Sequence, residues 1–526
     1  ITVAKELRRR GWPSDKVVLV EASADIGGRM RTERHPLGFL YDAGAAYVHG
    51  TVGNPIASIA EEAGILLKQV STGNPWLEET ASMALFSRGE RATEEETWEV
   101  DELFRTLRSR VSSRSDGCDD PNVRVSDTMG EILREEPFSS LSAAKMARLR
   151  FRMASMALWH GGDLHDLQLL EFGTGDDGSS VGLERCGDYP GPHCVVDGGV
   201  RRIIDALATD EVTECLRLGS RVESVTVLDA SKEDSVGERA DGGAHLPRAG
   251  KERQGTGVLV TVRKAENASG EGETEVLHGD VAVVTVPLSI LKRGSINFDP
   301  PIRQESKQAM FRLSTGDYEK IIAEFAQPFW PADVPCIGCC PVQPTPSTSC
   351  TSPDGYNERS NSTSAACPIG DLEIQGSKAS TGPQHADALT SPITPILVEN
   401  YLWSKGVPVL TAAVSGERGR RVARVVEAAA AAAATAAEAE GVADEEQEHD
   451  ENWRGVCARE LYDELMMPAL REAFGSIPDP VSVTVTGWAR EPHIRGSYSF
   501  FPLGAREDDI YCAGIGAAME AQAEGD

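Results

Sequence analysis

Residues 17–31 read VVLVEASADIGGRMR, and this stretch decides the fold class of the chain. Its opening residues, Val17–Val20, are all apolar and predict a short buried strand. Glu21 closes that strand with a carboxylate, and a short loop leads to a pair of glycines. In a Rossmann βαβ unit, the acid that ends the second strand accepts hydrogen bonds from the ribose of an adenine dinucleotide. Residues 1–11, ITVAKELRRRG, predict the helix that precedes this strand.

The glycine-rich phosphate loop of such a unit is not found in the sequence. That loop precedes the acid by about 20 residues, and counting back from Glu21 runs past Ile1. We therefore expect the chain to be a piece of a longer sequence. We also expect it to hold a dinucleotide weakly, because the N–H groups of the loop normally bind the phosphates.

Residues 17–50 continue as VVLVEASADIGGRMRTERHPLGFLYDAGAAYVHG, a series that resembles the flavin-dependent amine oxidases. This family includes polyamine oxidases, monoamine oxidases and the flavin-type histone lysine demethylases. A single GGR would fit an ordinary turn with surface arginines, but the ordered series of strand, acid, GGR and HG favours the family. The resemblance implies FAD as the cofactor. It implies that Glu21 accepts from the ribose, that Gly27 and Gly28 allow close approach of the backbone, and that Arg29 and Arg31 lie near the pyrophosphate and flavin. It also implies that Val222 contacts the adenine and that Trp488 packs at the flavin edge.

Two later stretches carry the same resemblance. Residues 281–302, VAVVTVPLSILKRGSINFDPPI, are similar to the TVPLGVLK signature of the family, and residues 487–504 read GWAREPHIRGSYSFFPLG. From the residues alone, 257–262 and 281–286 predict two strands.

The resemblance implies a fold of the α/β plus α+β class, in which a discontinuous Rossmann-like FAD-binding domain is interleaved with a substrate-binding domain. We expect the FAD-binding domain in residues 1–75 and 191–300, the helical part of the substrate domain in 76–190, its sheet part in 301–480, and an incomplete segment of the FAD and substrate site in 481–526. Biased composition predicts insertions at 229–255, 347–395 and 423–452. Within the last of these, the alanine tract 428–439 predicts a helix with no apolar pattern to bury.

Three residues are candidates for the chemistry. Lys320 leads the run KIIAEFAQPFW, which is similar to a polyamine oxidase strand whose lysine lies under the flavin and holds a water against its N5 atom. A solvent-exposed lysine at a strand edge is the alternative. Tyr498, in the run RGSYS, matches an aromatic that stands over the flavin face and frames the amine. A core aromatic is the alternative for Tyr498 and for Trp488.

His49 is the third candidate and the marker of specificity. It stands in a pattern, A-x-x-x-HG-x-x-x-GNP, that resembles the animal-type spermine and acetylpolyamine oxidases, where a histidine faces the substrate amines. The alternative is a turn histidine that bonds to the backbone.

The charge of the chain limits its partners. A formal net charge of −30 argues against binding to a nucleic-acid backbone, and it suits a cationic substrate. An equal alternative to a role in substrate attraction is that acidic surface loops account for much of the negative charge. The 11 cysteines show no spacing typical of a metal site, so no metal is expected. No apolar run is long enough for a membrane-spanning helix.

The sequence therefore predicts an FAD-dependent amine oxidase that uses oxygen to oxidise a polyamine and releases hydrogen peroxide. Two alternatives remain: a histone lysine demethylase-like oxidase, which would bring chromatin partners, and a non-catalytic relic. We expect an intracellular protein of the cytoplasm, with the nucleus and the peroxisome as the alternatives.

Overall fold

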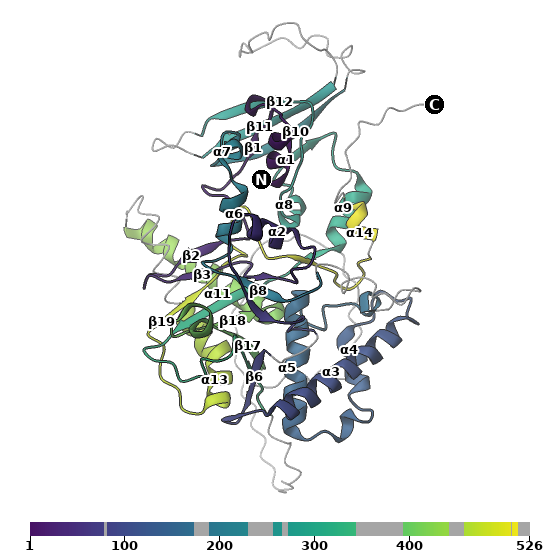
Figure 1. Cartoon of the computed structure of the whole chain (residues 1–526). Coiled ribbons are helices and arrows are strands. Elements are labelled where there is room, and N and C mark those ends of the chain that lie inside the picture. The colour runs from purple at the N-terminus through teal and green to yellow at the C-terminus, as the bar shows by residue number, and fades with distance from the viewer. Residues whose placement is uncertain are drawn as a thin grey trace.

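The computed structural model describes residues 1–77, 82–172, 189–229, 256–265, 272–342, 393–440, 457–506 and 508–513. Figure 1 shows three regions stacked along the long direction of the molecule. The β10–β12 strands and α1 lie at one end, α2 and α6 lie in the middle, and a large sheet with its helices forms the other end. None of the helices in these described ranges combines the length and the apolar character that a membrane crossing requires.

The large sheet has seven strands among the described residues. In spatial order these are β19 (Ser482–Val485), β15 (Glu319–Glu324), β18 (Val409–Val414), β17 (Ile396–Asn400), β16 (Cys336–Cys339), β6 (Met83–Ser87) and β7 (Glu90–Arg91). The central strands are buried over their whole length, because helices cover both faces of the sheet. One face packs against α11 (Gly416–Glu440), the π-helical turn Tyr462–Met466 and α13 (Met467–Phe474).

A second layer, made of α3 (Glu94–Ser115), α4 (Val125–Ile132) and α5 (Ala143–His160), packs against the other face. Thr93 starts α3 with a capping box, since its hydroxyl accepts from the Glu96 N–H and the Glu96 carboxylate accepts from the Thr93 N–H. Phe104 and Leu107 of α3 have no exposed surface and anchor the helix in the core. The expectation of a helical segment over 76–190 is wrong for β6, which pairs in parallel with β16. All five residues of β6 are buried, and only the pairing with β16 identifies so short a run as a strand.

The predicted first helix and strand are present as α1 (Thr2–Arg9) and β1 (Leu19–Val20). β1 pairs in parallel with β9 (Leu216–Arg217). The prediction of a strand buried over Val17–Val20 is only partly confirmed, because β1 consists of Leu19 and Val20, which are half-buried. Val17 is buried before the strand begins, but Val18 is 44% exposed. The neighbouring sheet has the order β12 (Thr274–Gly279), β11 (Thr256–Lys264), β10 (Ser220–Asp229) and β13 (Asn297–Asp299). This is the α/β part of the fold, and it forms the end of the molecule where Figure 1 labels β10–β12.

The prediction of a strand at 281–286 is wrong. The strand of this region is β12, and the valines that follow it extend along the surface, with Val281, Val283 and Val284 exposed by 78%, 64% and 43%. Among the described residues no strand pairs with this segment. An apolar run becomes a strand only where a neighbour supplies the hydrogen bonds, and the sequence does not show whether one is there.

The middle of the molecule connects the two ends. A sheet of order β4 (Tyr47–Val48), β8 (His193–Val196) and β5 (Leu67–Ser71) packs beside α2 (Pro55–Glu62) and α6 (Arg201–Leu207). The remaining elements are the strand pair β2 (Thr32–Arg34) and β3 (Leu40–Asp42), the pair β14 (Ser314–Thr315) and β20 (Ser499–Phe500), the helices α7 (Asp210–Thr213), α8 (Leu288–Lys292), α9 (Gln304–Arg312), α10 (Tyr401–Lys405) and α14 (Asp508–Cys512), and the 3₁₀ turns Ser14–Lys16, Phe138–Ser140 and Leu169–Phe172.

The predicted insertions are only partly described. Residues 230–255, 347–392 and 441–452 lie outside the described residues. The alanine tract is helical, as predicted, and continues α11. The expectation that it has nothing to bury is wrong, because Ala430 continues the buried face of Val422 and Val426 against the large sheet.

Candidate active site

Lys320 lies in β15, and only 2% of its surface is exposed. Its ammonium group donates hydrogen bonds to the carbonyls of Asp42, at 2.7 Å, and Gly44, at 2.9 Å. A buried ammonium group is costly unless hydrogen bonds replace its water, and these carbonyls do so. The burial excludes the alternative of a lysine in solvent at a strand edge. Lys320 therefore ties the large sheet to the segment that follows β3.

Glu319, the residue before Lys320, is a buried acid that sequence reasoning missed. Its carboxylate accepts hydrogen bonds from the Thr486 hydroxyl, at 2.5 Å, and from the Ala489 N–H, at 3.2 Å. Burial outweighs these bonds and raises the pKa of Glu319 to about 7. The same Thr486 oxygen accepts from the backbone N–H of Lys320, so this carboxylate helps to fix the position of the lysine.

Trp488 contacts the same short segment, residues 42–44, that Lys320 contacts. Its indole N–H donates to the Ala43 carbonyl at 3.0 Å, and its ring is 5% exposed. Gly44 passes close to the ring, since a Cβ at this position would lie 3.0 Å from Trp488 and 1.9 Å from the Arg29 carbonyl. Lys320 thus donates to the carbonyls of Asp42 and Gly44, and Trp488 donates to the Ala43 carbonyl between them.

His49 lies in a cluster of aromatic rings. Its ring is edge-on to Trp76, at 5.5 Å between centroids, and to Trp159, at 4.8 Å. The Nδ1 atoms of His49 and His193 are 3.2 Å apart. Two nitrogens at this distance share one proton, so one imidazole donates and the other accepts. Trp76, Trp159 and His193 were not predicted, because they come from segments far apart in the sequence.

Tyr498 reaches the same cluster from the other side. Its hydroxyl donates to the carbonyls of Leu158, at 2.8 Å, and Trp159, at 3.1 Å, at the end of α5. Gly161 makes this approach possible, because a Cβ there would lie 2.6 Å from the tyrosine ring. The ring itself is 38% exposed, so Tyr498 is not a core aromatic. Trp159 therefore contacts both candidates, His49 through its ring and Tyr498 through its backbone carbonyl.

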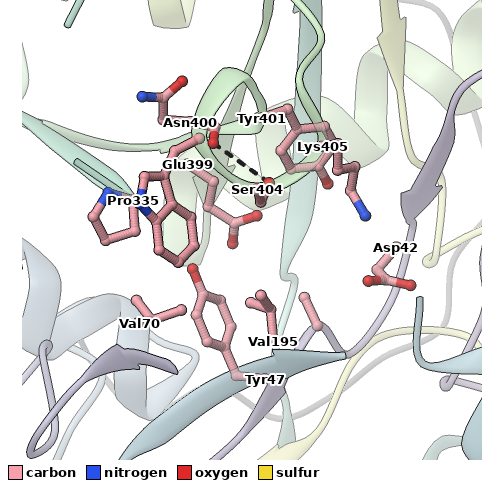
Figure 2. A pocket seen from close by; sticks show the side chains of 12 residues that line it. Asp42, Tyr47, Val70, Val195, Pro335, Glu399, Asn400, Tyr401, Ser404 and Lys405 are labelled. Atoms are coloured by element: carbon pink, nitrogen blue, oxygen red, sulfur yellow. Dashed lines mark hydrogen bonds between the residues drawn. The ribbon is translucent and has the colours of Figure 1, made fainter. Parts of the chain in front are cut away.

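A pocket opens between β4 and the β17–α10 segment, next to the lysine contacts (Figure 2). Acidic, aromatic and aliphatic side chains line it: Asp42, Ala46, Tyr47, Val70, Val195, Pro335, Glu399, Asn400, Tyr401, Trp403, Ser404 and Lys405. Asp42 belongs both to this lining and to the carbonyl contacts of Lys320, so the pocket and the lysine are neighbours.

The residues predicted to bind a dinucleotide fall into two groups. Glu21 and Val222 lie together, because the Glu21 carbonyl accepts from the Ser220 N–H at 2.8 Å and Val222 follows in β10. The Glu21 carboxylate accepts from the Ser23 N–H at 2.8 Å. Val222 is partly buried and pairs with Val262.

Gly27, Gly28 and the two arginines form the second group. The glycines adopt φ angles of +112° and +55°, which L-residues with a Cβ rarely adopt. Arg31 forms an ion pair with Glu491 at 2.9 Å and stacks on Trp488 at 4.7 Å. Arg29 donates to the Ser497 carbonyl, and no carboxylate of the described residues lies within ion-pair distance of it.

The comparison with known proteins identifies the family. A sequence profile described as "Flavin containing amine oxidoreductase" matches residues 1–372 and 443–511, well over half of the chain. The chain belongs to this family. Membership implies FAD as the cofactor.

Relatives within the amine oxidoreductase family have two kinds of name. Polyamine oxidase 2 of Arabidopsis thaliana is 26% identical over 326 residues, which cover 60% of this chain and 55% of that protein. Lysine-specific histone demethylase 1B of Mus musculus is also 26% identical, over 64% of this chain and 34% of that protein. Protein FLOWERING LOCUS D of Arabidopsis thaliana is 25% identical over 64% of the chain and 36% of its own length. The chain thus spans between about a third and about half of the length of these relatives.

The residues from Glu21 to Arg29 fit a flavin dinucleotide. Although Arg29 is exposed to solvent, the protein around it lowers its pKa by desolvation. A cation without a carboxylate partner suits a phosphate oxygen. Glu21 offers a carboxylate at the end of β1, where a ribose hydroxyl would donate. Gly27 and Gly28 lie between Glu21 and Arg29 in the sequence. Because they have no side chains, a ligand can approach the backbone closely there.

A possible metal group has partners of its own. Asp163, His165 and Asp166 are the described residues that approach one another closely enough to share an ion. Both carboxylates, however, pair with Arg420, at 3.4 and 3.1 Å. The group is therefore part of an ion-pair network between the loop that follows α5 and the start of α11.

Proposed function

We propose that this chain is part of an FAD-dependent oxidase that acts on an aliphatic polyamine, spermine or an acetylated polyamine. The products are an aldehyde, a shorter amine and hydrogen peroxide, from one molecule each of the amine, water and oxygen. The observation that carries the proposal is the arrangement around Lys320, whose buried ammonium group lies beside the pocket and next to Gly44 and Trp488.

The cofactor residues act by binding and orientation. Glu21 would accept from the ribose, Arg29 would bind the pyrophosphate, and Val222 would contact the adenine. FAD supplies the two-electron acceptor that oxygen reoxidises.

Lys320 holds the water that the reaction consumes. An ammonium group has three N–H donors, and two of them are used by the Asp42 and Gly44 carbonyls. The third can hold a water molecule close to the reacting carbon, where it adds to the imine of the substrate. Burial in the sheet keeps the lysine in one position, which favours this orientation.

The aromatic cluster around His49 suits a cationic chain. The faces of Trp76 and Trp159 attract ammonium groups by cation–π contact without requiring a fixed hydrogen bond. The net charge of −30 would draw polyamines toward the site. His49, with its Nδ1 proton shared with His193, gives the cluster a polar group that can bind a neutral amine nitrogen.

A histone lysine demethylase-like oxidase is the second candidate. Its support is the equal identity, 26%, to the mouse lysine-specific histone demethylase 1B. A methylated lysine side chain carries one reacting nitrogen, whereas a polyamine carries several. Chromatin partners would belong to this candidate alone.

The test is a side-by-side assay of four substrates. The purified chain, supplied with excess FAD, is given spermine, N-acetylspermine, spermidine or a methylated histone-tail peptide, and hydrogen peroxide is measured. We expect turnover of a polyamine and none of the peptide. Turnover of the peptide alone would replace the polyamine proposal by the second candidate. Absence of flavin absorbance after gel filtration, together with no turnover of any substrate, would favour the relic.

A further inference from the structure

Glu399 is a buried acid that lines the pocket beside Lys320. It lies in the interior strand β17, and 8% of its surface is exposed. Figure 2 shows its carboxylate directed into the pocket, toward the Tyr47 hydroxyl on the opposite wall. A carboxylate in such a place is costly unless a cation or several hydrogen bonds compensate for the lost water.

The other charged groups of the pocket already have partners. The Asp42 carboxylate accepts from the Thr32 hydroxyl, at 2.6 Å, and from the Val200 N–H, at 3.0 Å. The Lys320 ammonium is held by backbone carbonyls. Lys405 lies over the Tyr401 ring at 5.2 Å. Asp42 and Lys320 thus have hydrogen-bond partners other than Glu399, and Lys405 forms no ion pair with Glu399 among the described residues.

Glu399 itself lacks an ion pair within the described part of the chain. Lys320 and Lys405 act on it only at longer range. The Tyr47 hydroxyl, which also lies 3.7 Å from the Cys336 Sγ, faces Glu399 across the pocket. Burial raises the pKa of Glu399, the charge of Lys320 opposes this rise, and the charge of Asp42 adds to it. The pocket thus contains one acid that a ligand cation would stabilise.

We propose that Glu399 and the Tyr47 hydroxyl form a subsite that binds a protonated amino group of the substrate. The subsite rests on the proposed function and deepens it, because it names the group that is recognised. A ligand ammonium would supply the missing counter-charge and the donors that the carboxylate lacks. Since Asp42 joins the pocket to Lys320, the bound ammonium would lie next to the nitrogen that reacts.

The test compares Glu399→Gln, which keeps the shape and removes the charge, with a matched control. The probe is spermine, titrated by calorimetry without oxygen into the chain supplied with excess FAD. We expect the variant to bind spermine at least about 10-fold more weakly, as for the loss of a charge-assisted hydrogen bond. The control Glu324→Gln removes a partly buried acid from β15 and should bind spermine like the wild type. Equal affinities in wild type and Glu399→Gln would overturn the subsite.

A pH series gives a second measurement on the wild type, which does not depend on how the variant folds. Binding needs the carboxylate form, so the affinity should fall as pH is lowered through the pKa of Glu399. The raised pKa places this fall at a higher pH than for an exposed glutamate. Other titratable groups also face Glu399, and Glu399→Gln should remove the fall if the glutamate causes it. These groups are Asp42, Lys320, Lys405, Tyr47, Tyr318, Cys336 and Tyr401. A wild-type affinity that stays level down to the acid range would contradict the subsite.

The subsite and the oxidase can fail separately. Spermine binding that depends on Glu399, with no peroxide formed, would keep the subsite and remove the proposed reaction. Peroxide formation with equal spermine affinity in both proteins would keep the reaction and remove the subsite.

Discussion

The large sheet buries ionisable side chains, whereas the segment 281–286 exposes apolar side chains. In the sheet, Glu319, Lys320 and Glu399 are charged side chains with at most 8% exposure. In the segment, valines that would ordinarily be buried lie in solvent, with Val281 exposed by 78%.

The comparison shows that both regions contain features that lower the stability of the fold. Buried charges destabilise a core unless each one has partners, so their presence in the interior strands points to chemistry. The exposed valines lose the stabilisation of burial, which is about 0.8 kcal/mol for each CH₂ group, and they have no partner among the described residues. Variants in the two regions should therefore affect different properties.

The largest effect is expected for Lys320→Met. The lysine would also share a proton with the water that it holds, and this water would assist reoxidation by oxygen. Amine-dependent reduction or oxygen-dependent reoxidation of the flavin should therefore slow by about 10²–10⁴-fold, the range for loss of a positioned proton-transfer group. Stopped-flow absorbance of the chain supplied with FAD measures both steps, and circular dichroism checks the fold. Unchanged rates would remove the lysine from the mechanism and leave it a purely structural contact to Asp42 and Gly44.

A pair of truncations tests the stability side of the comparison. Ile321→Ala removes a fully buried side chain from β15 and should lower the free energy of unfolding by about 2–5 kcal/mol. Val283→Ala removes an exposed side chain and should change it by about 0.5 kcal/mol or less. Urea denaturation measures both. A loss at Val283 as large as at Ile321 would mean that the segment is covered in solution.

An effect smaller than that of Ile321→Ala is expected for the pH dependence due to Glu319. Its pKa is about 7 in the folded chain against an ordinary value of 4.5, so the folded state holds the proton over this interval while the unfolded state releases it. The free energy of unfolding should therefore fall as pH rises from 4.5 to 7, relative to Glu319→Gln. We expect a difference of about 1–3 kcal/mol between the ends of the interval. A constant difference between the two proteins would show that the carboxylate is ionised throughout.

The sequence by itself determined the family and the order of its motifs. The strand and helix that open the chain, the acid at Glu21 and the later signatures are local patterns, and local patterns survive without knowledge of the fold. The same holds for the helix over the alanine tract, because alanine favours a helix wherever it lies. The roles of Lys320, His49 and Tyr498 were inferred from resemblance and remain predictions. Lys320 contacts Asp42 at the edge of the pocket, whereas His49 and Tyr498 do not line it.

Only the tertiary structure decided which residues meet. His193, Trp76 and Trp159 reach His49 from three separate segments, and Glu399 reaches the pocket from a strand whose sequence, ILVEN, shows no motif. The structure also corrected the strand at 281–286 and revealed β6, since both depend on whether a partner strand is present. Hydrogen-bond pairing and burial are properties of neighbours in space, and a single sequence records neighbours only along the chain.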